Sequence, residues 1–571
     1  MSGMSTIQKS FFWRDCRLVA YLACLLALAL FSQLVPGSAT TASAYTNLSP
    51  TQVKTMVENG TAGTILDVRE YDEYCTAYGG HIPCALNYPW NTGYLQSHYT
   101  ELDPDATYIV VCRSGNRSVS ASSFLESQGF TKIYNMSGGM SSWQGATQTC
   151  DEECTRCLDA QCPVLYFPHI DCTSGWQTEV ALINTSDSEA FSGELRAYRA
   201  DGGLVDTRNI VLAVRGRAEF AVQQAFAHPE TIRYLVLTSD VSHVAGYAKF
   251  YMAGKYRVSV PAQAELNASR IIVPHIASDN LWWTGIALVN TTDEARDITI
   301  SFSDGSILSR NVAAHQHTSF SIRDLFGGAA KPNLTSAVID NCPGFIGLEL
   351  FGGMTSDVLS GIPFSPTQAT ELVFPHVVND STWWTGLVAY NPAAVTNGMT
   401  VTAYCPQGLL LYQSSQTLNA GQRYFGTPGM LQLPENTAWF RISASQPLAG
   451  FELFGRVDVD ELAGFSAVGL PRTTGILPKL DPSGWTGVVF VNTEDGPVEI
   501  TLEAVTNNGQ TVATGGAVLE AHTKLVGLAG NFFPAGLGSA SYLRFTANGK
   551  VAGFQMNGSA DETMLDAIPA L

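Results

Sequence analysis

Short apolar runs alternate with amphipathic segments in the first quarter of the chain. Four runs are typical of buried strands, at 64–68, 85–88, 108–111 and 132–136. Between them, Ser49 can cap a helix that extends to Glu58, and a second helical pattern over 116–128 ends at Gly129, a common helix C-cap. Alternating strands and helices predict a parallel α/β sheet, in which functional residues gather at the carboxyl ends of the strands.

The rest of the chain shows a different pattern, in which short alternating strands recur in four repeats. A proline followed by His or Lys recurs about every 100 residues, as Pro168-His169, Pro274-His275, Pro375-His376 and Pro478-Lys479. A tryptophan motif follows each pair, and turn signals such as Asp304-Gly305 separate the strands. We predict four all-β sandwich repeats, at 165–269, 270–370, 371–472 and 473–571. Two propeller blades per repeat, which would form an eight-bladed ring, are the alternative.

Two features of the repeats invite a ligand hypothesis. His169, His275 and His376 could suggest a metal, but they fall in separate repeats and Lys479 takes the fourth place. We therefore interpret them as a recurring structural corner, and predict neither a metal site nor a cofactor. The doubled tryptophans at 282–283 and 383–384 could stack on sugars, although packing within or between repeats is the favoured interpretation.

Residues 1–44 have the layout of a secretory signal peptide. Basic residues precede an apolar run at 18–31, and Ala42-Ser43-Ala44 offers a cleavage site. The run is shorter than a membrane-spanning helix prefers, and no later stretch predicts a span. We expect a cleaved signal and an exported protein, periplasmic or extracellular, with association to the cell envelope left open. An uncleaved anchor or a lipoprotein signal at Cys24 are the alternatives.

The charge balance narrows the classes of partner. The 50 acidic residues outnumber the 31 basic ones, which gives a net charge of −19. Nucleic-acid binding needs a basic footprint, and docking on anionic lipid needs basic clusters, so both are disfavoured. Only 14% of the 571 residues are charged while 45% are hydrophobic, which excludes a largely disordered chain.

One loop of the α/β region carries a candidate nucleophile. The apolar run YIVV leads into Cys112, Arg113, Ser114, Gly115, Asn116, Arg117 and Ser118, and a helical pattern follows. A thiol between a strand end and a helix N-terminus lies in a positive field, to which the two arginines add. Backbone N–H groups of such a loop can surround one anion. The arrangement favours a thiolate, and a buried structural cysteine is the alternative.

Five segments in order resemble the rhodanese domain, a single-domain sulfurtransferase module. They are LDVRE at 66–70, EY at 73–74, GHIP at 80–83, VVCRSGNRS at 110–118 and NMSGGMSSWQG at 135–145. The resemblance covers about 100 residues and places the domain at 45–148. It implies a five-stranded parallel sheet flanked by helices.

The resemblance also implies a chemistry. Cys112 would accept the outer sulfur of a donor such as thiosulfate, and the resulting persulfide would pass it to cyanide or a thiol. The loop from Cys112 to Arg117 is one residue shorter than the loop of phosphatases built on this fold. Residues 113–118 would bind the anionic donor. Asp67 and Arg69 would support the site, and His81 would pack rather than act as a base.

The remaining cysteines suggest disulfides in an exported chain. Cys84 stands where the rhodanese family has a small residue, and a Cys75–Cys84 disulfide is the first interpretation, with a resolving thiol as the alternative. A linker at 149–164 holds Cys150, Cys154, Cys157 and Cys162. We predict a disulfide knot there that could include Cys172. An iron–sulfur cluster is a weak match on spacing, and zinc or a thiol relay to Cys112 are further alternatives.

Two classes of function follow. The first is an exported sulfurtransferase that works through Cys112 and is carried on a β-repeat scaffold. The second is an extracellular binding or adhesion protein whose rhodanese-like domain is not catalytic. The intact loop favours the first for 45–147, and the extent of the β repeats favours a protein or cell-surface partner.

Overall fold

The computed structural model describes residues 45–58, 63–83, 85–99, 102, 104, 106–147, 163–263, 269–364, 368–378 and 380–571. The chain divides into two compact units, 1–159 and 160–571, and each is described by itself. The expected signal peptide, the four linker cysteines and Cys84 lie outside the described residues. Among the residues described, no helix is both long enough and apolar enough to cross a membrane.

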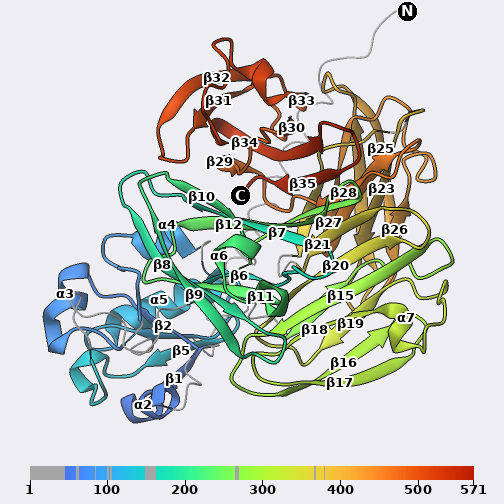
Figure 1. The fold of residues 1–571 in the computed structure, drawn as a ribbon. Helices are drawn as coiled ribbons and strands as arrows, with labels where there is room; N and C mark the ends of the chain where they lie inside the picture. Colours follow the sequence, from blue (N-terminus) through green and yellow to red (C-terminus); the bar gives the residue numbers. More distant parts are fainter. Residues whose placement is uncertain are drawn as a thin grey trace, which may run out of the picture. The chain divides into compact units, whose positions relative to one another are not determined.

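The first unit is built on a five-stranded parallel sheet with the order β1-β5-β4-β2-β3 (Figure 1). Its strands are β1 (Thr46–Leu48), β2 (Thr64–Asp67), β3 (Leu86–Asn87), β4 (Tyr108–Val111) and β5 (Ile133–Met136). Its helices are α2 (Pro50–Glu58), α3 (Tyr71–Thr76), α4 (Tyr94–His98) and α5 (Asn116–Ser127), with 3₁₀ turns η1 (Ala77–Gly79) and η3 (Met140–Ser142). The predicted parallel α/β sheet is confirmed.

Side chains of the central strands alternate between two cores. Leu66 and Val110 pack on one face with Leu125 of α5, whereas Ile65 and Ile109 pack on the other with residues of α2. This alternation follows from the two-residue period of a strand. Because both faces are covered, the central strands are mostly apolar and can be predicted from the sequence.

The second unit is all-β, as predicted, and one pairing scheme of antiparallel strands occurs four times along it. We call the four parts of the chain that carry this scheme stretches; they span 163–261, 270–363, 369–466 and 472–569. In the first stretch the two sheets have the orders β6-β11-β8-β9 and β10-β7-β12-β13. The second stretch pairs β14-β19-β16-β17 and β18-β15-β20-β21 in the same way. In the third and fourth stretches one strand of 18 residues, β27 or β34, runs through both sheets.

The bounds of the elements in this unit are as follows. The strands are β6 (Pro163–Phe167), β7 (Gln177–Asn184), β8 (Phe191–Tyr198), β9 (Leu204–Leu212), β10 (Arg217–Ala221), β11 (Tyr234–Thr238), β12 (Val244–Met252), β13 (Tyr256–Pro261), β14 (Arg270–Val273), β15 (Trp282–Asn290), β16 (Arg296–Phe302), β17 (Ile307–Val312), β18 (His317–Ser321), β19 (Ala337–Asp340), β20 (Phe345–Gly353), β21 (Leu359–Pro363), β22 (Ala369–Phe374), β23 (Trp383–Tyr390), β24 (Asn397–Tyr404), β25 (Leu410–Leu418), β26 (Arg423–Gly426), β27 (Trp439–Arg456), β28 (Leu462–Ser466), β29 (Arg472–Leu477), β30 (Gly484–Asn492), β31 (Val498–Val505), β32 (Thr511–Leu519), β33 (Lys524–Leu528), β34 (Tyr542–Ser559) and β35 (Leu565–Pro569). Short helical turns are α6 (Val222–Ala225), η5 (Pro229–Thr231), α7 (Ile322–Leu325) and η6 (Ala529–Phe532).

The last strand of each stretch lies at the centre of this unit. Strand β13 contacts β21, β21 contacts β28, β28 contacts β35, and β35 contacts β13, so the four strands close a ring. Each stretch also has its own apolar core, to which both of its sheets contribute. Each stretch contributes one strand to the ring, which therefore has four members, so the alternative of an eight-bladed ring is wrong.

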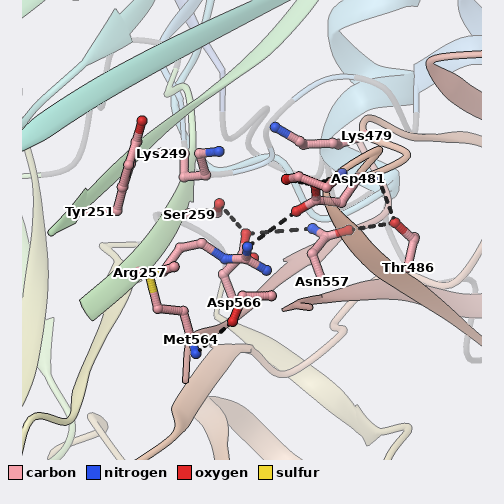
Figure 2. Close-up of polar contacts among 12 residues, drawn as sticks. Lys249, Tyr251, Arg257, Ser259, Lys479, Asp481, Thr486, Asn557, Met564 and Asp566 are labelled. Carbon is pink, nitrogen blue, oxygen red and sulfur yellow. Dashed lines mark hydrogen bonds and ion pairs between the residues drawn. The ribbon is translucent and has the colours of Figure 1, made fainter. Parts of the chain in front are cut away.

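A polar network joins the last stretch to the first (Figure 2). Arg257 of β13 lies between two carboxylates of the last stretch, with its Nε 2.7 Å from Asp566 and its Nη1 3.1 Å from Asp481. Lys479 reaches back to Glu219 of β10, with 2.8 Å between Nζ and Oε1. The side chains of Arg257, Asp481 and Asp566 are at most 5% exposed, so this boundary is a desolvated ionic contact.

Candidate functional site

Cys112 lies directly after β4, at the carboxyl edge of the parallel sheet. Its residue is 1% exposed, and its Sγ accepts a hydrogen bond from the Gly115 amide at 3.2 Å. Sγ also lies 3.3 Å from Ser118 Oγ, to which it donates. Gly115 has φ of 101° and precedes the first residue of α5, so the loop turns tightly onto the helix N-terminus.

A second segment supports the backbone of Cys112. The amide of Met140 donates to the Cys112 carbonyl at 2.8 Å, and the amide of Ser141 donates to the Arg113 carbonyl at 2.9 Å. Gly139 lies between these contacts with φ of 57°, and a Cβ there would meet the Cys112 carbonyl oxygen at 2.3 Å. The close approach therefore requires glycine at this position.

The two arginines of the loop already have partners. Arg117 forms a two-point ion pair with Glu73 of α3, at 2.6 and 2.8 Å. The hydrogen bond to Glu73 raises the Arg117 pKa, and the negative charge of a Cys112 thiolate raises it further. Arg113 is exposed and donates from Nε to the Tyr78 hydroxyl at 3.0 Å. Both guanidinium groups of the Cys112 loop therefore have side-chain partners outside the loop.

Glu73 and Tyr78 are site residues that our sequence analysis did not assign. The Glu73 carboxylate pairs with Arg117 and also accepts from the Glu70 amide at the start of α3. The hydrogen bond from Arg117 is the first cause of a lowered Glu73 pKa. Tyr78 has φ of 61° and lies 35 residues from Arg113. In the sequence, the EY motif at 73–74 could have pointed to Glu73, whereas no pattern pointed to Tyr78.

Asp67 and Arg69 form a buried unit beneath the site. Both side chains are 0% exposed, and Arg69 Nη2 lies 2.7 Å from Asp67 Oδ2. Arg69 also donates to the carbonyl groups of Glu73, Ala77 and Gly80. It thus fixes α3 and the turn after it, which carry the partners of both loop arginines.

The other residues assigned from sequence occupy varied environments. Ser114 and Asn116 are exposed at the loop surface. His81 stacks on Tyr74 at 3.7 Å between ring centroids, and burial lowers its pKa. Because Cys84 lies outside the described residues, the Cys75–Cys84 disulfide stays a prediction.

The structure corrects one expectation about the cysteines. Among the described residues, Cys112, Cys172, Cys342 and Cys405 are free. Cys172 therefore takes no part in the disulfide knot expected of the linker. Burial raises its pKa to about 11, which is typical of an inert structural thiol.

Known proteins match the first unit. A family model described as rhodanese-like domain matches residues 49–146. YtwF of Bacillus subtilis is 35% identical over 101 residues, which make up 18% of this chain and 92% of YtwF. GlpE of Ectopseudomonas mendocina, named a thiosulfate sulfurtransferase, is 31% identical over 102 residues, 18% of this chain and 87% of GlpE. The match to YrkF of Bacillus subtilis, 34% identical over 111 residues (19% of this chain), spans only 57% of that protein.

The chain belongs to the rhodanese family through its domain at 49–146. A solved structure of a rhodanese-related protein from Thermoplasma volcanium is 34% identical and covers 17% of this chain and 90% of its own, with a TM-score of 0.15. By its identity to YtwF and GlpE the domain is homologous to sulfurtransferases, and its candidate nucleophile is Cys112.

Proposed function

We propose that this protein is an exported sulfurtransferase that moves sulfane sulfur from a donor such as thiosulfate to a thiol or cyanide. The position of the Cys112 sulfur carries the proposal. Sγ lies at a strand end within 3.2 Å of the Gly115 amide, ahead of the N-terminus of α5. That environment favours the anionic sulfur that both half-reactions need.

The reaction divides into two displacements at sulfur. In the first, the Cys112 thiolate attacks the outer sulfur of thiosulfate, the S–S bond of the donor breaks, and sulfite leaves with the electron pair. The product is a Cys112 persulfide that carries one negative charge. In the second, cyanide attacks the terminal sulfur, thiocyanate leaves, and the Cys112 thiolate is regenerated.

The surrounding residues have distinct roles in this proposal. The Gly115 amide donates to Sγ and stabilises negative charge there, and once Cys112 is deprotonated the Ser118 hydroxyl can turn from the Gly115 carbonyl to donate to Sγ as well. Arg113 attracts the dianionic donor to the exposed loop. Arg117 contributes its charge beside Cys112, although Glu73 offsets part of it. Asp67 and Arg69 hold this frame in place.

The larger second unit serves in this proposal as a scaffold of four β-sandwich repeats. The supporting observation is the strand-pairing scheme that occurs four times between 163 and 571. Export is supported by the signal-peptide pattern of 1–44, and the Cys75–Cys84 disulfide would suit an oxidising compartment. A partner protein or a cell surface is the proposed target of the repeats.

The test is sulfur transfer by the purified chain from thiosulfate to cyanide, with Cys112→Ser as the inactive variant. Cys172→Ser is the matched control, because Cys172 is also a free thiol but lies in the second unit. We expect thiocyanate formation and a mass gain of one sulfur after thiosulfate treatment, both lost only in Cys112→Ser. Absence of both from the wild-type chain, under reducing and non-reducing conditions, would refute catalysis and favour a binding or adhesion protein.

A further inference from the structure

Two of the histidines that follow the recurring prolines meet the next stretch at one equivalent strand position. His169 Nδ1 lies 3.4 Å from His317 Nε2, the first residue of β18. His275 accepts a hydrogen bond from Arg423, the first residue of β26. These contacts place each histidine at a boundary between consecutive stretches.

A cavity opens beside the second of these contacts. It has a volume of about 350 Å³, which lies within the range typical of ligand sites. Five aromatic side chains line it: Trp282, Phe351, Trp384, Phe425 and Phe451. They come from β15, β20, β23, β26 and β27, so two consecutive stretches form the walls.

The polar end of this cavity holds a cation without a neutralising partner. Arg423 donates from Nη1 to His275 and to the Thr335 carbonyl, the latter at 2.7 Å. Among the described residues, no carboxylate lies within ion-pair distance of Arg423, and no hydrogen bond uses its Nε or Nη2. Its guanidinium carbon lies 4.3 Å from the Phe425 ring centroid, which orients the group along an aromatic wall.

Burial and the neighbouring ionisable groups shift the pKa of Arg423 and of the residues around it. Burial lowers the Arg423 pKa to about 10, so the group stays protonated. Burial and then Arg423 lower the His275 pKa to about 3, which agrees with Nδ1 acting as an acceptor. Burial raises the Glu349 pKa well above its usual value, and the charge of Arg423 offsets part of that rise. Asp279 also lines the cavity, and its carboxylate accepts hydrogen bonds from the Leu281 and Trp282 amides.

We propose that this cavity binds a small carboxylate with a flat, aromatic body. The carboxylate would pair with the free N–H groups of Arg423, and the ring would lie between the aromatic walls. Nothing in this proposal depends on the chemistry of Cys112, which belongs to the other unit.

A second cavity in the same molecule shows what Arg423 adds. It has about 410 Å³ and lies at the preceding boundary, lined by His169, Trp176, Phe250 and Trp283, and by Lys255, whose charge is already paired with Asp357. The strand position of Arg423 is taken there by His317, whose pKa burial lowers well below the usual value. We therefore expect the carboxylate to select the cavity with the arginine.

The test is calorimetric titration of the full chain with phenylacetate and with its neutral analogue phenylacetamide. Phenylacetate should bind to one site, and phenylacetamide about tenfold or more weakly. Arg423→Gln should weaken phenylacetate by about tenfold or more and leave phenylacetamide nearly unchanged. Arg441→Gln, which removes another arginine of the third stretch that does not line the cavity, should bind as the wild type does.

A second variant keeps the test decisive if Arg423→Gln does not fold. Met430 lines the cavity but is 69% exposed, so Met430→Trp can fill the space without disturbing a core. It should weaken both probes. Equal binding of acid and amide, unchanged binding by either cavity variant, or no saturable binding to the wild type would each overturn the proposal.

Discussion

Replacing Gly139 with alanine tests whether the segment behind Cys112 positions the nucleophile. The new Cβ would lie 2.3 Å from the Cys112 carbonyl oxygen, whereas ordinary contact begins at 3.4 Å, so the two segments must separate by about 1 Å. Gly139 also has φ of 57° and ψ of −160°, a region that is nearly confined to glycine. The strain and the two hydrogen bonds at risk together cost about 2–6 kcal/mol of folding free energy.

The displacement should also lower the catalytic rate. A displacement of about 1 Å in a reacting group costs about 100-fold in rate. We therefore expect Gly139→Ala to lose about 100-fold in kcat/KM for thiosulfate–cyanide transfer, measured at 10 °C where the folded state persists. Persulfide formation, followed by intact mass, should slow to the same degree.

Gly129→Ala is the matched control for this measurement. Gly129 has φ of 95°, but nothing lies within 4 Å of its added Cβ. It should lose about 1 kcal/mol of stability and keep its activity. The reasoning is refuted if Gly139→Ala retains activity within about threefold of wild type, or if Gly129→Ala loses as much.

Three further perturbations follow from the ion pairs. Glu73→Gln should lower the KM for thiosulfate severalfold, because it frees the charge of Arg117; an unchanged or higher KM in steady-state kinetics would contradict this. Asp67→Asn leaves a buried guanidinium uncompensated and should destabilise the first unit by about 3–5 kcal/mol in denaturant unfolding, and a loss below 1 kcal/mol would contradict the role. Burial alone would raise the Glu219 pKa, but its cationic neighbours, including Lys479, lower it to about 2. The ionised Glu219 carboxylate therefore makes its full contribution to stability above the ordinary carboxyl pKa and loses it as pH falls towards 2. Glu219→Gln should reduce the acid dependence of the unfolding free energy, measured from about pH 5 to 2.5.

The sequence predicted the strands of the first unit that are buried on both faces of the sheet. Strands β2, β4 and β5 are apolar on both faces and were identified with small shifts at their ends. Strand β1 was missed from the pattern because Thr46 and Asn47 are exposed, and only the family resemblance implied a fifth strand. Helices α3 and α4 have six and five residues, which is too short for a helical period to show.

The site was predictable where it is local in sequence. Cys112, Gly115 and Ser118 lie within one turn and loop, and their spacing carries the motif. The pair of Glu73 and Arg117 joins residues 44 positions apart, and no local pattern reports such a contact. For the same reason, the recurring motifs of the sequence indicated four stretches, but the ring that the last strands of these stretches close could not be predicted.

Closure of that ring affects how the second unit unfolds. Ser259 of the first stretch bonds to Asp566 of the last, a separation of 307 residues. Loop-closure entropy grows only logarithmically, so spanning three times the length of one stretch costs about 1 kcal/mol more than spanning one. Open rows of repeats can fray from either end, whereas a closed ring has no end from which to start. The four stretches should therefore unfold together, in one cooperative transition.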